Sequence, residues 1–183
     1  MTSRRRFLLG SLYWPAVCRA LEPAKPAQIL LIRHAEKTGS KADANLNPRG
    51  YERAAALPRL FPARFDTPQF IFAAHASAHS NRPVETVTPL SRALHLAIDS
   101  QFANQDYAGL AKHLFSKPLY ANRTILVCWH HGNIPSLAKA LGVEHPPQPW
   151  PDTQFDRVWK IEYRDTGVRF SDLPQQLLPG DSG

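Results

Sequence analysis

The sequence predicts a three-layer α/β/α sandwich, in which helices cover both faces of a mostly parallel central sheet. Three apolar runs of strand length are continuous rather than alternating, as expected for strands buried on both faces: Gln28–Ile32, Phe70–Ala74 and Thr124–Trp129. Segments with helical patterns separate and follow these runs, and this alternation is typical of α/β proteins. The length of 183 residues fits one domain with a sizeable core.

Four helices are expected around this sheet. The first opens at Asn47, whose side chain can cap a helix, and Pro48 suits the first turn. Asn81 and Pro83 open the second helix in the same order. Gly142 ends the last one. The predicted helices are those that begin near Asn47 and Asn81, followed by Tyr107–Leu119 and Pro135–Leu141.

Charge gives little support for a nucleic-acid partner. The chain has 22 basic and 15 acidic residues, a formal net charge of +7. Four of the arginines lie in the first 20 residues, and without them the balance is 18 against 15, or +3. The remaining basic residues form no run or stripe, so we expect an anionic small-molecule substrate rather than DNA or RNA.

The first residues have the order of an export signal. Ser3–Leu9 resembles the twin-arginine signal of bacteria, and the apolar stretch Phe7–Val17 has 11 residues, too few to span a bilayer. We therefore expect residues 1–27 to be a signal peptide and linker, and the mature protein to be periplasmic or exported. The alternative is a basic tail on a cytoplasmic protein. The domain is expected to cover residues 28–175, with a loose tail at 176–183.

The residues with reactive side chains follow the predicted strands directly. Arg33 and His34 follow the first strand, residues 75–82 follow the second, and residues 130–133 follow the third. In open α/β sheets, ligands bind beyond the carboxyl ends of the strands. Arginine forks match phosphate oxygens, a histidine can attack phosphorus, and fixed cations can stabilise the transferred group without a metal. The sequence therefore predicts a phosphoryl-transfer site at this edge.

The motifs at these positions resemble those of a known superfamily. Leu31–Thr38 resembles the opening signature of the histidine phosphatase superfamily, also called phosphoglycerate-mutase-like. Three further segments resemble its later motifs, in the expected order: Leu46–Ala54, Ser80–Thr86 and Ile125–Pro135. The resemblance implies a phosphoglycerate-mutase-like fold.

The resemblance also implies roles for individual residues. His34 would be the phosphorylated nucleophile, and Arg33 and Arg82 would hold the phosphoryl oxygens. A histidine near position 131 would stabilise the transition state. We prefer His131, because Asn133 follows it at the spacing that the family uses, whereas strand length alone favours His130.

The general acid has two candidates. Asp106 follows the second arginine motif roughly where the family often supplies its acid, but it is equally suited to cap the helix that begins at Tyr107. Glu36 is the competitor, because it is close to the nucleophile in sequence. The sequence does not choose between them.

These observations together predict a phosphatase that hydrolyses phosphate monoesters through phospho-His34. We expect no metal and no organic cofactor, since His75, His79 and His130 lack the spacing of a metal site. The chain has no large insertion to build a substrate cap, which favours a small or exposed phosphate, such as one on a sugar or a surface glycan. The alternatives are a phosphomutase and a non-catalytic phosphate-binding envelope protein. The sequence does not predict the oligomeric state.

Overall fold

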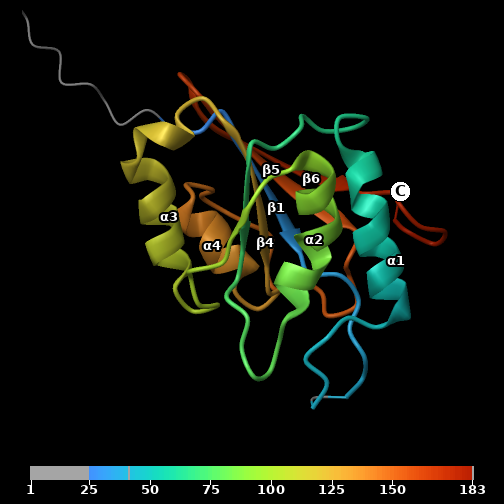
Figure 1. The fold of residues 1–183 in the computed structure, drawn as a ribbon. Coiled ribbons are helices and arrows are strands. Elements are labelled where there is room, and N and C mark those ends of the chain that lie inside the picture. The colour runs from blue at the N-terminus through green and yellow to red at the C-terminus, as the bar shows by residue number, and fades with distance from the viewer. Residues whose placement is uncertain (1–24, 41, 183) are drawn as a thin grey trace, which may run out of the picture.

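The computed structural model describes residues 25–40 and 42–182 and contains a six-stranded sheet with the order β3-β2-β4-β1-β5-β6 (Figure 1). Among these six strands only β5 runs against the others, since β1 to β4 pair in parallel and β6 is antiparallel to β5. This confirms the predicted mostly parallel sheet. The strands are β1 Gln28–Arg33, β2 Phe70–Ala73, β3 Ile98–Asp99, β4 Thr124–Trp129, β5 Arg157–Arg164 and β6 Gly167–Pro174.

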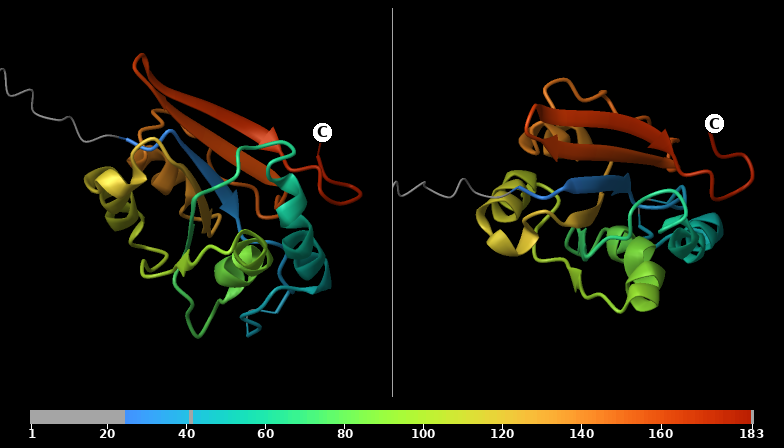
Figure 2. Two further views of the ribbon diagram at one scale, coloured as in Figure 1. Left: turned by 45° about the horizontal axis from the view of Figure 1, so that its top comes forward. Right: turned by 90° about the horizontal axis from the view of Figure 1, so that it is seen from above.

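Helices cover both faces of the sheet, as predicted (Figure 2). One layer holds α1 and α2 with the short 3-10 helix η1, and the other holds α3 and α4 with η2. The Asn47 side chain accepts a hydrogen bond from the main-chain N–H of Gly50 at 2.8 Å, which confirms the predicted cap of α1. The bounds are α1 Pro48–Ala56, η1 Leu57–Leu60, α2 Arg82–Leu94, α3 Tyr107–Ser116, η2 Pro118–Tyr120 and α4 Ile134–Ala140.

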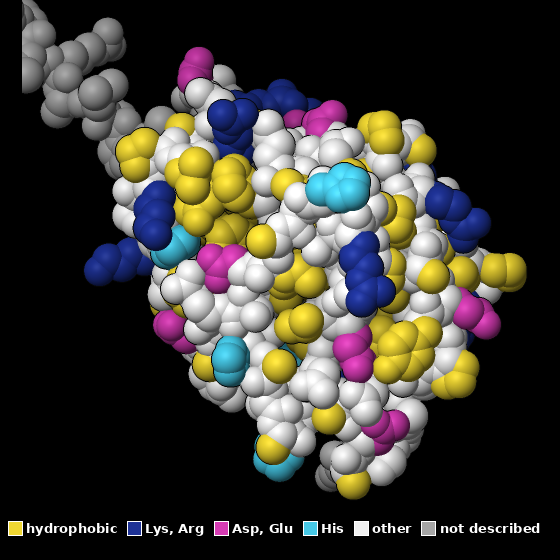
Figure 3. Space-filling model, in the orientation of Figure 1, with side chains coloured by type: hydrophobic (Ala, Val, Ile, Leu, Met, Phe, Trp, Pro, Cys, Tyr) yellow, Lys and Arg dark blue, Asp and Glu magenta, His cyan; other side chains and the backbone are white. Residues whose placement is uncertain are grey.

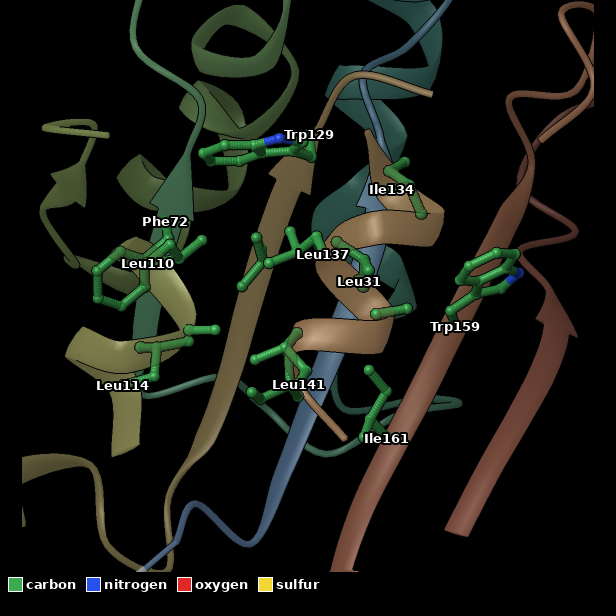
Figure 4. Packing of buried hydrophobic residues seen from close by; sticks show 14 of the residues in the cluster. Leu31, Phe72, Leu110, Leu114, Trp129, Ile134, Leu137, Leu141, Trp159 and Ile161 are labelled. Carbon is green, nitrogen blue, oxygen red and sulfur yellow. The ribbon is translucent and has the colours of Figure 1, made fainter. Parts of the chain in front are cut away.

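Strand β1 contributes to a hydrophobic core on each side of the sheet. Ile29 and Leu31 pack with residues of α3 and α4, whereas Leu30 and Ile32 pack with residues of η1 and α2. Figure 4 shows the first of these cores, with Leu31 beside the side chains of α4. Successive side chains of a strand point to opposite faces, so an unbroken apolar run is required when both faces are covered.

The late part of the chain differs most from the expectation. In the sequence, the aromatic residues Trp150, Phe155, Trp159 and Tyr163 favour one late strand. The structure has instead the hairpin of β5 and β6, with β6 at the edge of the sheet. Half-exposed side chains along β6 give it no apolar run that would stand out in the sequence. Strand β3 also went unpredicted, because two residues carry no periodicity.

The expectation of a loose tail at 176–183 is corrected. The side chain of Asp181 is 3% exposed and accepts hydrogen bonds from Arg53 at 2.7 and 2.8 Å. Arg49 donates to the carbonyl of Pro179 at 2.8 Å, and Leu177 packs against the core that η1 and α2 cover. A buried ion pair thus fastens this segment to α1, and the last described residues lie near α1 in Figure 1.

The predicted signal peptide and most of its linker lie outside the described residues. Across residues 25–40 and 42–182, none of the helices combines the length and the apolar character that a membrane span requires.

Candidate active site

The carboxyl ends of β1, β2 and β4 meet at one edge of the sheet, as predicted. Arg33 is paired in register with Trp129, and the N–H of His34 donates to the carbonyl of Trp129 at 3.0 Å. The N–H of Ala74 donates to the carbonyl of Cys128 at 3.0 Å. The loops that leave these strands gather at the lower edge of the view in Figure 1. The parallel ladder therefore brings residues 33–34, 75–82 and 130–133 together.

The hydrogen bonding of His34 leaves one ring nitrogen available as a nucleophile. The side chain is buried, and its Nδ1 lies 2.7 Å from the carbonyl oxygen of Ala35. Because a carbonyl oxygen only accepts, Nδ1 carries the proton and Nε2 keeps its lone pair. Burial holds the pKa of His34 well below its ordinary value, and the neighbouring His130, Arg33 and Arg82 lower it further. The ring is therefore neutral at physiological pH.

His130, rather than the preferred His131, packs its ring against His34. The two ring centroids are 5.2 Å apart in an edge-to-face arrangement. Burial and the charge of Arg82 lower the pKa of His130 to about 4. A cavity of about 420 Å³ opens beside it, lined by residues that include His75, Arg82 and Asn104.

His131 points to a different group. Its Nε2 lies 2.7 Å from Oδ1 of Asp152, and its Nδ1 is buried without a hydrogen-bond partner. The structure thus places both candidate histidines beside the strand end but in different surroundings. The choice of His131 as the second catalytic histidine stays a prediction.

Arg33 is held rigidly by the loop before β5. Its Nη1 donates to the carbonyls of Pro151, Asp152 and Gln154 at 3.0, 2.8 and 3.1 Å. The ring of Phe155 lies 3.9 Å from Cζ, close enough for a cation–π contact. Desolvation lowers the pKa of Arg33 to about 10, so the guanidinium is still charged at neutral pH. Its Nε and Nη2 have no hydrogen-bond partner.

Arg82 begins α2 and is tied to the loop that carries His34. The N–H of Ala35 donates to Oγ1 of Thr86 at 2.9 Å, and that hydroxyl donates to the carbonyl of Arg82 at 2.7 Å. The guanidinium donates to the carbonyls of Asp43 and His79 at 3.0 and 3.3 Å. One turn of α2 therefore fixes the second arginine relative to the nucleophile.

Polar atoms without partners surround this site. In the described part of the chain, every buried side-chain nitrogen or oxygen that lacks a hydrogen bond lies at this edge of the sheet, at the end of β1, at the start of α2 or in the loops beside them. Five of the six can donate a hydrogen bond. Buried polar groups are normally paired, so this arrangement is that of a site for a ligand with several acceptor oxygens. The atoms are Nε and Nη2 of Arg33, Oγ1 of Thr38, Nε of Arg82, Oδ1 of Asn104 and Nδ1 of His131.

Neither predicted acid is directed at the nucleophile. Asp106 is exposed, and its Oδ1 accepts from the N–H of Gly109 at 3.2 Å as the cap of α3. Glu36 accepts from Nε and Nη2 of Arg53 at 2.8 to 3.1 Å, and Nε of Arg49 lies 3.4 Å away. Within residues 25–40 and 42–182, neither carboxylate hydrogen-bonds to Arg33, His34 or Arg82.

Several residues of the site were not anticipated from the sequence. Asp152 and Phe155 contact Arg33 from a proline-rich loop that has no periodicity and no motif. Thr86 lies within the second arginine motif, but its bond to Ala35 spans 51 residues. In the sequence, the prolines of residues 146–151 indicate only that this segment is irregular.

The described residues contain no cluster of three or more histidine, cysteine, aspartate or glutamate side chains arranged to hold a metal ion. His75, one of the residues weighed as a metal ligand, has its Nδ1 2.8 Å from the carbonyl of Ser100. Arg82 lines the same cavity as His75, and its positive charge would repel a metal ion there.

Solved structures share the fold, although no protein-family model and no curated protein matches the sequence. The protein histidine phosphatase SixA in complex with tungstate has a TM-score of 0.59 and 12% identity, covering 81% of this chain and 97% of that one. Phosphoserine phosphatase from Entamoeba histolytica has a TM-score of 0.57 and 15% identity, covering 82% and 99%. Mycobacterial glucosyl-3-phosphoglycerate phosphatase has a TM-score of 0.57 and 14% identity, covering 81% and 97%. The chain has the fold of these phosphatases.

Proposed function

We propose that this chain is a histidine phosphatase, which hydrolyses phosphate monoesters through a covalent phosphohistidine on His34. One observation carries the proposal: a buried histidine with a free Nε2 lies among two arginines whose inner N–H groups have no partner. A phosphoryl group would supply the missing acceptors. The fold shared with several phosphatases is consistent with this chemistry.

The reaction would proceed in two displacements at phosphorus. The phosphoryl oxygens bind Arg33 and Arg82, and the lone pair on Nε2 of His34 attacks phosphorus. The N–P bond forms as the bond to the leaving oxygen breaks, and that oxygen takes up a proton. Water then attacks phosphorus and loses a proton, while the N–P bond breaks and its electron pair returns to Nε2. The bond from Nδ1–H to the carbonyl of Ala35 stabilises the positive charge on the phosphorylated ring.

The proposed substrate is a small or exposed phosphate, such as one on a sugar or a surface glycan. The cavity beside His130 measures about 420 Å³, a size that suits a small molecule. Lys and Arg side chains are dispersed among neutral and acidic ones on the face seen in Figure 3, which argues against a nucleic-acid partner. The similar structures include a phosphoserine phosphatase, a glucosyl-3-phosphoglycerate phosphatase and a protein histidine phosphatase.

We further propose that the protein acts in the periplasm or outside the cell, after export through the leader in residues 1–27. This rests on the basic, apolar and small segments in that order. Localisation of a tagged full-length chain, compared with an Arg4→Lys and Arg5→Lys double variant, tests it. Retention of both proteins in the cytoplasm would contradict export.

The function is tested by hydrolysis of p-nitrophenyl phosphate by the full chain and by its His34→Ala variant, both in the presence of a chelator. We expect activity in the first only, together with an acid-labile phosphoenzyme that is trapped on rapid quenching. Binding of inorganic phosphate without turnover would instead favour a non-catalytic phosphate-binding protein. Transfer of the phosphoryl group to a second position of a sugar phosphate, rather than to water, would favour a phosphomutase.

A further inference from the structure

Asp152 contacts two residues of the proposed site at once. Its main-chain carbonyl accepts from Nη1 of Arg33 at 2.8 Å, and its carboxylate Oδ1 lies 2.7 Å from Nε2 of His131. The same oxygen lies 3.8 Å from Nη2 of Arg33. Arg33 and His131 come from the ends of β1 and β4, so one loop residue joins the two central strand ends.

The contact with Asp152 determines which nitrogen of His131 remains for a ligand. A carboxylate accepts a hydrogen bond, so Nε2 of His131 is the donor to Asp152. The other nitrogen, Nδ1, is buried and has no partner. In the neutral ring Nδ1 would carry a lone pair, which repels a phosphoryl oxygen. Only the protonated ring donates from both nitrogens.

The charged groups around His131 oppose one another. Burial lowers the pKa of His131, and the positive charges of Arg33 and Lys37 lower it further. The carboxylate of Asp152 acts in the opposite direction and raises it. The adjacent His130 is neutral near pH 7, because its pKa is about 4. Asp152 is therefore the group in these surroundings that favours the protonated form of His131.

We infer that Asp152 is a positioning residue for the proposed reaction: it holds His131 through Nε2, so that Nδ1–H can donate to a phosphoryl oxygen in the transition state. This inference rests on the proposed phosphatase function. An aspartate that orients a histidine and favours its charged form is a known device in enzymes. Neither Asp106 nor Glu36 makes such a contact with either histidine in the described residues.

The position of Asp152 allows its carboxylate to be removed without disturbing the fold. The side chain is 75% exposed, so truncation creates no cavity. An Asp152→Ala variant keeps the main-chain carbonyl that binds Arg33. In an Asp152→Asn variant the amide oxygen can still accept from Nε2, but the negative charge is absent.

The test uses the full chain and p-nitrophenyl phosphate, with kcat and KM measured across pH for Asp152→Ala, Asp152→Asn, His131→Ala and the Asp152→Ala/His131→Ala double variant. Asp165→Ala, in the exposed turn between β5 and β6, removes the same charge at a distance from the site. We expect Asp152→Ala to lower kcat by about 10- to 100-fold with little change in KM. The kcat of Asp152→Asn should lie between those of Asp152→Ala and the wild type. The basic limb of its pH profile should move to lower pH, because the negative charge that raises the pKa of His131 is absent.

The double variant distinguishes positioning from a general effect on the loop. If Asp152 acts through His131, its truncation costs nothing further once His131 is alanine. Additive losses in the double variant, or wild-type kinetics in Asp152→Ala, would overturn the inference while leaving the proposed function intact. A wild-type chain no more active than His34→Ala would overturn the proposed function, and the inference with it.

Discussion

The rings of His34 and His130 pack edge to face with their centroids 5.2 Å apart. This contact buries the nucleophile and places a second neutral imidazole beside it. Two neutral rings can share a small space without charge repulsion, whereas two imidazolium ions would repel each other strongly. The packing is therefore part of what keeps Nε2 of His34 unprotonated and ready to attack.

Removal of His130 should change the pH dependence of the reaction. In His130→Ala, water reaches His34 and its desolvation decreases, so the pKa of His34 rises towards its ordinary value. Attack requires the neutral ring, so activity is lost as pH falls through this pKa. We expect the acidic limb of kcat/KM to move to higher pH. An acidic limb in the same place as in the wild type would show that His130 does not bury the nucleophile.

We expect that lysine cannot substitute functionally for either Arg33 or Arg82. Arg33→Lys and Arg82→Lys each remove an inner N–H that lacks a partner, and the remaining ammonium cannot make a two-pronged contact. We expect kcat/KM for p-nitrophenyl phosphate to fall by about 100-fold, as for loss of a donor to transition-state charge. Inhibition by inorganic phosphate should weaken in parallel. Arg59→Lys, at an exposed position of η1, is the matched control; a loss of the same size there would show that the effect is not local.

The two roles considered for Asp106 can be separated by substitution. As the cap of α3, Asp106→Ala should lower the free energy of unfolding by about 1 kcal/mol, and Asp106→Asn much less, because asparagine also caps helices. Chemical denaturation measures this difference. As a general acid, Asp106 would be needed only for poor leaving groups. A loss of activity in Asp106→Asn that is confined to alkyl phosphates would support the acid role predicted from the place of Asp106 after the second arginine motif. Unchanged rates of hydrolysis would show that Asp106 serves only as the helix cap.

The ion pair between Asp181 and Arg53 should make stability depend on acidity. Burial raises the pKa of Asp181, but hydrogen bonds from Arg53 and from main-chain N–H groups lower it to about 2. Since the pKa of Asp181 in the folded protein is below the ordinary value for an aspartate, this stabilisation is present above about pH 4 and is lost as pH falls to about 2.

An Asp181→Asn variant tests this contribution. It should lower the free energy of unfolding at pH 7 by about 3 kcal/mol, because the buried guanidinium of Arg53 loses a charged partner. It should also flatten the dependence of stability on pH between 4 and 2. Asp165→Asn, in an exposed turn, should change neither quantity. Equal stability of Asp181→Asn and the wild type at pH 7 would contradict a structural role for the tail.

The local features of the fold could be predicted because they depend on residues close together in the chain. Continuous apolar runs identified β1, β2 and β4, and the cap at Asn47 identified the start of α1. Parallel pairing then implied that Arg33, His34 and the histidines after β4 share one edge. Helix capping and strand burial are set by neighbours within a few positions, so the sequence alone carries these signals.

The tertiary structure alone decided how the side chains of the site are held. Arg33 and Asp152 are separated by 119 residues, and Arg53 and Asp181 by 128. Such contacts arise only when the chain returns across the sheet, and no local pattern records where an irregular loop will lie. The orientation of His130 towards His34 and of His131 towards Asp152 has the same origin. Adjacent residues at a strand end point in different directions, and the packed loops determine what each one meets.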